Sequence, residues 1–228
     1  MCSAAWSFQD GGYQLAFNRD EKWLRPPASD PTLETDHPVP GICARDSQGH
    51  GTWLFTNQHG LTLALLNAYP PGQNFAAGKI SRGHIPLLAA QATNPASLIT
   101  LLNHHPWPDY APCHLLLIAE DHLSLFTWSG SRFSKDPAPP QPYLTSSSVH
   151  PEQTRKIRTR RFLEIQSRPL EEILADTSNP DPPSNIHVTR ADGGTVSQIL
   201  ILVTREKITF SLTSRDQPKM TIAIPRIH

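Results

Sequence analysis

The sequence predicts an α+β fold in which helices cover largely antiparallel sheets, and three observations support this prediction. Four segments each place two β-prone runs on either side of a short polar or glycine-bearing turn. Two pairs of helical segments lie between these hairpins. The runs LALL, LLLI and ILILV are apolar on consecutive residues, which indicates strands covered on both faces. Hairpins that alternate with helix pairs predict a layered architecture.

Each predicted hairpin joins two runs through a turn of a few residues. The four hairpins are CSAAWSF–QDGG–YQLAFN, GTWLFT–NQHG–LTLALLN, HLLLIA–EDH–LSLFTW and SQILILV–TREK–ITFSLTS. The predicted helices span residues 80–91 and 95–102, and then residues 151–166 and 169–175. Three of these four helices begin at a proline, which is favoured in the first turn of a helix.

The composition argues against several classes of function. The 20 basic and 20 acidic residues give zero net charge, so no chain-wide attraction to nucleic acid or an anionic membrane is expected. We interpret the basic run at residues 155–161 as a solvated helix face, because no aromatic residues interleave it. No apolar run approaches the ~20 residues of a membrane-spanning helix. We therefore expect no nucleic-acid partner, no membrane insertion and a cytoplasmic location.

Cysteine and histidine usage favours neither a disulfide framework nor a metal site. The three cysteines are odd in number and match no zinc spacing. Cys43 and Cys113 are expected to be small buried residues. The 11 histidines form no HExxH-like pattern, so the predicted site contains no metal.

The first hairpin brings Cys2 close to the cluster Asn18-Arg19-Asp20-Glu21. A two-residue turn at Gly11-Gly12 would place Cys2 opposite Glu21, and a shift of one residue would place it opposite Asp20. The register decides which of these side chains share a face with Cys2, because a slip of one residue reverses every side chain. The sequence leaves that register open.

Removal of Met1 would give Cys2 both a thiol and a free α-amine. An α-amine titrates near neutrality and can take the thiol proton, directly or through a water molecule. Arg19 would favour the thiolate, and a carboxylate would hold the ammonium. The spacing alone also allows the alternative that Cys2 is a chance occurrence and residues 18–21 are a solvated strand end.

Several segments, in order along the chain, resemble the NRDE-motif family, also called the transport and Golgi organisation protein 2 family. They are MC at the start, AFNRDE, GTWLFT with LTLALLN, and SRGHI. The second half is similar to the family in LLLIAEDHLSLF, YLTSSSV and TVSQILILV. The resemblance implies one domain over residues 1–228. It also implies an N-terminal nucleophile hydrolase-like fold, a four-layer α-β-β-α sandwich.

Within that fold, the resemblance extends to the cholylglycine and penicillin V acylases, which cleave a linear non-peptide amide. It implies that Cys2 is nucleophile and base, that Asp20 contacts its α-amine, and that Asn67 donates to the oxyanion with a backbone N–H. Arg19 completes the catalytic set. The residues expected to bind the ligand are Asn18, Glu21, Trp53, Arg82 and Ser146.

Two departures from the acylase pattern bear on activity. The acylase arginine stands three residues before the aspartate, where this sequence has Phe17, and Arg19 directly precedes Asp20. We expect this displacement to change the face that the arginine occupies. Ser146 stands where the acylases have an asparagine, and a serine is shorter and has one donor.

Members of the NRDE family are linked to haem mobilisation and to lipid or acyl-CoA homeostasis. The resemblance therefore implies a haem- or lipid-related trafficking role without turnover; no cofactor is required and haem is a possible ligand. The alternative is an N-terminal cysteine amidohydrolase acting on a small amide or acyl substrate. A scaffold with a vestigial site is a third possibility. The expected partner is a small molecule, and the sequence leaves the oligomeric state open.

The aromatic side chains leave one further alternative open. Trp53, His59, Trp107 and Trp128 would line an apolar pocket for such a ligand or would belong to the core, and core packing is the more common role.

Overall fold

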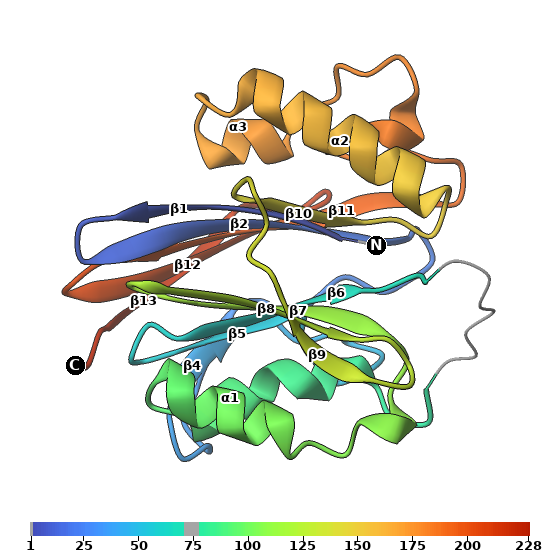
Figure 1. Ribbon diagram of the computed structural model, residues 1–228. Helices are drawn as coiled ribbons and strands as arrows, with labels where there is room; N and C mark the ends of the chain where they lie inside the picture. Colours follow the sequence, from blue (N-terminus) through green and yellow to red (C-terminus); the bar gives the residue numbers. More distant parts are fainter. Residues whose placement is uncertain (1, 71–77) are drawn as a thin grey trace.

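The computed structural model describes residues 2–70 and 78–228, and its backbone forms two antiparallel sheets between two helical layers (Figure 1). The six-stranded sheet has the order β10-β1-β2-β11-β12-β13, and the seven-stranded sheet has the order β3-β4-β5-β6-β7-β8-β9. The bounds of the first sheet's strands are Tyr143–Ser146, Cys2–Gln9, Gly12–Lys22, Gly193–Val203, Lys207–Ser214 and Met220–Pro225. Those of the second are Thr32–Glu34, Gly41–Cys43, Leu54–Asn57, Thr62–Asn67, Cys113–Ala119, His122–Trp128 and Phe133–Asp136.

The helices lie on the outer faces of the two sheets (Figure 1). On the six-stranded sheet these are α2 (Pro151–Ile165) and α3 (Leu170–Leu174). On the seven-stranded sheet they are the 3-10 helix η1 (Arg82–Gln91) and α1 (Pro95–Asn103). Two short 3-10 turns, η2 (Trp107–Asp109) and η3 (Pro182–Ser184), complete the elements. The predicted layered α+β architecture is confirmed.

Three hydrophobic clusters fill the spaces between these four layers. The cluster between the two sheets contains Trp6, Phe17, Leu116 and Phe210. A second cluster packs η1 and α1 onto the seven-stranded sheet, and a third packs α2 and α3 onto the six-stranded sheet. Consecutive residues of LALL and LLLI alternate between the first and second clusters, so the prediction of strands covered on both faces is confirmed for β6 and β7.

All four predicted hairpins form, whereas the first predicted helix differs from its expectation. Residues 82–91 wind as a 3-10 helix with Pro86 inside it. Pro86 has no N–H to donate, and its ring would clash with the preceding turn of an α-helix, so a regular α-helix is disfavoured across this residue. The helix at Pro95 begins as predicted, and Asn94 and Ser97 cap it reciprocally.

The interpretation of the basic run as a solvated face is wrong at its centre. Arg158 has 0% exposure and projects from α2 into the protein, where it donates to Thr145 Oγ1 at 3.1 Å and to the Pro183 carbonyl at 2.9 Å. Arg155, Lys156 and Arg160 are exposed as expected. Among the helices of the described residues, none is long and apolar enough to cross a membrane.

Candidate functional site

The hairpin of β1 and β2 has a different register from both alternatives that the sequence left open. Gln9 pairs with Gly12 and Cys2 pairs with Arg19, so the turn consists of Asp10 and Gly11. Gly11 adopts the left-handed conformation, with φ of 71°. Gly12 lies within the strand against β11, where a Cβ would come 2.0 Å from the Val203 carbonyl oxygen. The expected pairing of Cys2 with Glu21 or Asp20 is therefore wrong.

The side chains of the Asn18–Glu21 cluster are divided between the two faces of β2, because side chains alternate along a strand. Arg19 and Glu21 lie on the face of Cys2. Asn18 and Asp20 lie on the face toward the helices, although Asp20 also contributes to the lining of the cavity described below. The expectation that placing the arginine at 19 rather than 17 changes its face is also wrong. Positions 17 and 19 are two apart, and Phe17 packs in the same cluster between the sheets as Cys2.

Asn18 holds the helical layer to β2 and is not a cavity residue. Its Nδ2 donates to the carbonyls of Leu174 at 2.8 Å and Ile186 at 3.1 Å. Asp20 lies two residues further along β2, and its Oδ1 accepts from Thr195 Oγ1 at 2.8 Å. The other oxygen, Oδ2, lies 3.9 Å from Nη1 of Arg158, and both side chains have 0% exposure.

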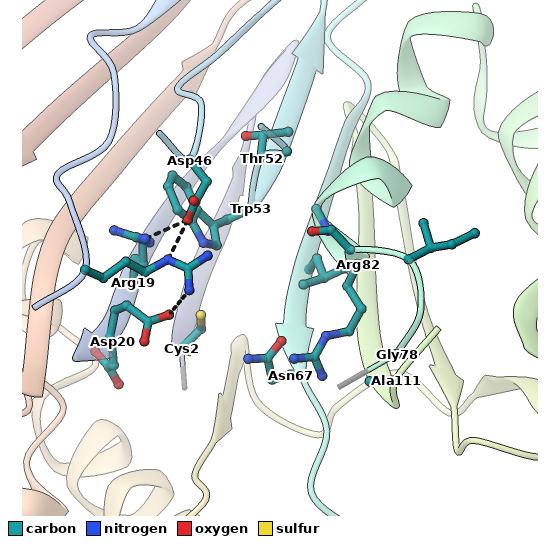
Figure 2. Close-up of a pocket in the computed structure, with 17 residues that line it drawn as sticks. Cys2, Arg19, Asp20, Asp46, Thr52, Trp53, Asn67, Gly78, Arg82 and Ala111 are labelled. Carbon is teal, nitrogen blue, oxygen red and sulfur yellow. Dashed lines mark hydrogen bonds and ion pairs between the residues drawn. The ribbon is translucent and has the colours of Figure 1, made fainter. Parts of the chain in front are cut away.

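A cavity of about 390 Å³ opens between the ends of the two sheets, with the side chain of Cys2 on its wall (Figure 2). It brings together seven of the nine residues expected from the sequence: Cys2, Arg19, Asp20, Glu21, Trp53, Asn67 and Arg82. Asn18 and Ser146 are outside its lining. Ser146 nevertheless contacts the start of β1, where its Oγ accepts from the Cys2 backbone N–H at 3.3 Å.

Cys2 is buried, with 4% of the residue's surface exposed to solvent. Burial, together with the nearby Asp20 carboxylate, raises the pKa of this thiol to about 11. The backbone N–H of Asp20, which donates to the sulfur, and the charge of Arg19 both oppose that rise in pKa. With residue 2 inside the chain, the thiol is therefore protonated at neutral pH. Met1, whose removal the amine-base mechanism requires, lies outside the described residues.

Arg19 is held by an acidic residue that the sequence analysis did not identify. Its Nη2 lies 2.9 Å from Oδ2 of Asp46, and its guanidinium lies over the ring of Trp53 at 3.9 Å from the centroid. Arg25 bonds the same carboxylate oxygen at 2.8 Å and lies 3.6 Å from Glu21. Burial lowers the pKa of Arg19.

Asp46 is itself fixed by a turn. Its Oδ1 accepts from the backbone N–H groups of Gln48 at 3.0 Å and Gly49 at 2.6 Å. Burial alone would raise the pKa of Asp46, but the bonds from Arg25 and Gly49 and the charges of Arg25 and Arg19 hold it below its ordinary value. The sequence signal was the run Asp-Ser-Gln-Gly, which is typical of an Asx turn.

The opposite wall of the cavity comes from the end of β6 and the start of η1 (Figure 2). Asn67 is the last residue of β6, and among the described residues its amide nitrogen makes one long contact of 3.5 Å, to the Tyr69 hydroxyl. Arg82 is the first residue of η1, and its Nη1 donates to the Pro112 carbonyl at 2.7 Å. In Figure 2 the Arg82 side chain extends toward Asn67. Both groups can donate hydrogen bonds to an oxygen atom in the cavity.

The remaining aromatic and cysteine residues have structural positions. Trp107 and Trp128 stack in the core beneath the seven-stranded sheet, whereas Trp53 borders the cavity. Cys43 and Cys113 are buried and unpaired, as predicted. Glu34, Asp36 and His37 place possible metal-ligand atoms within 4.8 Å of one another, but Glu34 is already ion-paired with Arg45.

Comparison with known proteins places the chain in a family and confirms the fold. The sequence pattern of the family described as transport and Golgi organisation 2 matches residues 1–163. No curated protein sequence matches the chain.

Two solved structures are similar to this chain over most of its length. One is the C2A mutant of conjugated bile acid hydrolase from Clostridium perfringens, with a TM-score of 0.60 and 12% identity over 99% of this chain and 92% of that chain. The other is a Caenorhabditis elegans N-acylethanolamine-hydrolyzing acid amidase ortholog, with a TM-score of 0.56 and 11% identity over 88% of this chain and 92% of that chain. The fold is therefore N-terminal nucleophile hydrolase-like.

Proposed function

The chain belongs to the transport and Golgi organisation 2 family, and from that premise we propose that its cavity is the site of an N-terminal cysteine hydrolase for small linear amides or acyl compounds. One observation carries the proposal: the same cavity is lined by the Cys2 side chain and by the amide donor of Asn67. A nucleophile needs a group that stabilises charge on the carbonyl oxygen it attacks, and an uncommitted amide meets that need.

The reaction begins once removal of Met1 has converted the Cys2 backbone nitrogen into an α-amine. The thiol proton passes to this amine, and the sulfur attacks the substrate carbonyl carbon. The carbonyl oxygen becomes an oxyanion that accepts from Asn67 and from a backbone N–H. Collapse of this intermediate breaks the C–N bond, and the leaving amine takes the proton from the α-ammonium.

A water molecule completes the cycle. It attacks the thioester carbonyl, gives one proton to the α-amine, and the thiolate leaves and recovers that proton. Ser146 already accepts from the nitrogen that becomes the amine, so it orients the base. The Asp20 carboxylate adjoins Cys2 closely enough to act on its charge, and it would stabilise the ammonium form between the two proton transfers.

A second candidate is a carrier that holds a haem or lipid-like ligand in this cavity without turnover. The raised pKa of the Cys2 thiol favours it, because a protonated thiol is a poor nucleophile. Haem itself suits the lining poorly. Among the described lining residues the only soft ligand for iron is Cys2, no histidine is present, and the walls carry six charged side chains. The hydrolase therefore has the stronger support.

The first experiment separates the two candidates by mass spectrometry and covalent labelling. We expect the intact protein to lack Met1 and a thiol-reactive acyl probe to add one acyl group. The label should be lost in Cys2→Ala and retained in the matched control Cys113→Ala, which removes another buried cysteine. Retention of Met1 on all molecules, or equal labelling of Cys2→Ala, would refute the hydrolase. A saturable Soret shift on titration with haem would instead support the carrier.

The proposal also covers the cellular compartment of the protein and the kind of partner it binds. The three cysteines are all buried and unpaired, which accords with a reducing compartment, so we propose a cytoplasmic location. The partner is a small molecule held in the cavity, with no nucleic-acid partner.

A further inference from the structure

The charged side chains that line the cavity have ion-pair partners, with one exception. Asp46 pairs with Arg19 and Arg25, at 2.9 and 2.8 Å. Glu21 lies 3.6 Å from Arg25, and Asp20 lies 3.9 Å from the buried Arg158, which is outside the lining. Each acidic group of the wall therefore has its own guanidinium. Within residues 2–70 and 78–228, Arg82 alone among the lining arginines makes no ion pair.

Arg82 is nevertheless held in a fixed position. Its Nη1 donates to the Pro112 carbonyl at 2.7 Å, which anchors one edge of the guanidinium. The backbone beside it is equally restrained, because Thr52 N–H donates to the Gly83 carbonyl at 2.8 Å. Gly51 approaches Gly83 so closely that a Cβ on Gly51 would lie 2.5 Å from the Gly83 carbonyl carbon. An anchored cation with donors to spare loses little side-chain entropy on binding a ligand.

The cavity is therefore polarised. Figure 2 places Arg82 on the wall opposite Cys2 and Arg19, with Asn67 on the same wall as Arg82. The carboxylates of Asp20, Glu21 and Asp46 come from elements on the other wall. If a substrate carbonyl lay between Cys2 and Asn67, the groups attached to that carbonyl would lie near the guanidinium of Arg82, which has no counter-charge among the described residues.

We propose that Arg82 is the receptor for an anionic group and that the cavity selects small amides carrying a carboxylate close to the scissile carbonyl. Arginine pairs with carboxylates through two parallel hydrogen bonds, and such charge-assisted bonds are the stronger kind. The cavity volume of about 390 Å³ is within the range of sites that bind small molecules. The claim that the anionic amide is cleaved rests on the proposed hydrolase, whereas the preference of the cavity for an anion does not depend on turnover.

The test compares probes that differ only in charge. One pair is N-hexanoylglycine and N-hexanoylglycinamide, with the carboxylate on the amine side. The other pair is N-butylsuccinamate and its neutral methyl ester, with the carboxylate on the acyl side. Binding to the Cys2→Ala protein is measured by titration calorimetry, which removes turnover from the measurement. We expect the anionic member of at least one pair to bind tenfold or more tightly than its neutral partner, and the preference to weaken with added salt.

Variants at Arg82 assign that preference to the residue. Arg82→Gln should abolish the difference between charged and neutral probes, Arg82→Lys should retain part of it, and the exposed control Arg132→Gln should retain all of it. Equal binding of both members in both pairs would overturn the inference, as would a preference that survives in Arg82→Gln. If Arg82→Gln does not fold, the charge preference of the Cys2→Ala protein and its weakening in Arg82→Lys decide the question.

The outcome is distinguishable from that of the hydrolase proposal. Anion-selective binding without release of amine from any probe by the Met1-processed protein would support the role of Arg82 and refute the hydrolase. Turnover of neutral probes at the same rate as anionic ones would support the hydrolase and overturn the role of Arg82.

Discussion

Arg19 lies directly across the strand pair from Cys2, and its guanidinium is bonded to Asp46 at 2.9 Å instead of standing free beside the sulfur. The pair is shielded from solvent and stacks on Trp53. Asp46 therefore decides where the positive charge next to the nucleophile lies, although it is far from the NRDE cluster in sequence.

Replacing Asp46 tests this arrangement. Asp46→Asn would leave the buried guanidinium of Arg19 without its counter-charge, and we expect the free energy of unfolding to fall by about 3 kcal/mol or more. Urea denaturation measures this change. The control is Asp36→Asn, an acid whose side chain is 85% exposed, for which a change within about 0.5 kcal/mol is expected. Equal effects of the two substitutions would show that the Arg19–Asp46 pair does not stabilise the fold.

Arg158 is the second charge whose removal should be costly. Arg158→Met would leave the carboxylate of Asp20 buried without the cation 3.9 Å away and would remove the bonds to Thr145 and Pro183. We expect a loss of about 3–5 kcal/mol in the free energy of unfolding. Arg160→Met, an exposed position on the same helix, is the matched control and should be nearly neutral. A loss in Arg158→Met no greater than that of the control would contradict the buried position.

The register of the first hairpin can be tested at Gly12. An added methyl group there would meet the Val203 carbonyl oxygen at 2.0 Å, so Gly12→Ala must push β2 and β11 apart. We expect a loss of about 2–3 kcal/mol in the free energy of unfolding. At Gly49 the nearest atom to such a methyl group is 3.4 Å away, so Gly49→Ala is the milder control. If Gly12 were instead in a turn outside the sheet, the two substitutions would have similar effects.

The buried thiols predict a loss of stability in mild alkali. Burial raises the pKa of Cys113 to about 12, and it also raises the pKa of Cys43. Unfolded thiols ionise near pH ~8.5, so above that pH the unfolded chain binds fewer protons than the folded chain. Stability should therefore fall as pH rises, by about 1.4 kcal/mol per unit for each fully shifted thiol.

Thermal unfolding between pH 8 and pH 9 measures this effect below the range in which unfolded tyrosines ionise appreciably. The variant Cys43→Ala/Cys113→Ala should lose stability less steeply with pH than the wild type, because fewer thiols titrate on unfolding. A slope unchanged by the double substitution would show that the thiols are not responsible.

Local patterns predicted the hairpins because each depends on two neighbouring runs and the turn between them. They did not predict β10, although Ser146 pairs with Cys2. Nothing near residue 146 in the sequence indicates that its partner is the second residue of the chain. The order β10-β1-β2-β11 results from contacts between segments that are distant in the sequence, and these are decided by packing.

The sequence predicted which residues line the candidate site better than it predicted the contacts that these residues make. Cys2, Asn67 and Arg82 came from the motif resemblance and do line one cavity. Asp46 was missed because its role depends on the arginines it meets in the folded chain. Asn18 was expected in the site as a member of the Asn18–Glu21 cluster, yet alternation along the strand turns its side chain toward α3.

The alternation along β2 also limits how the chain can change in length during evolution. Deleting a single residue between Gly12 and Phe17 would exchange the side chains on the two faces of β2, turning Arg19 toward the helices and Asn18 toward the cavity. The side chains of both faces would lose their partners through this one deletion. Gains or losses in this strand are therefore tolerable only in steps of two residues, or where a bulge restores the phase, as between Thr195 and Ser197 on the neighbouring strand.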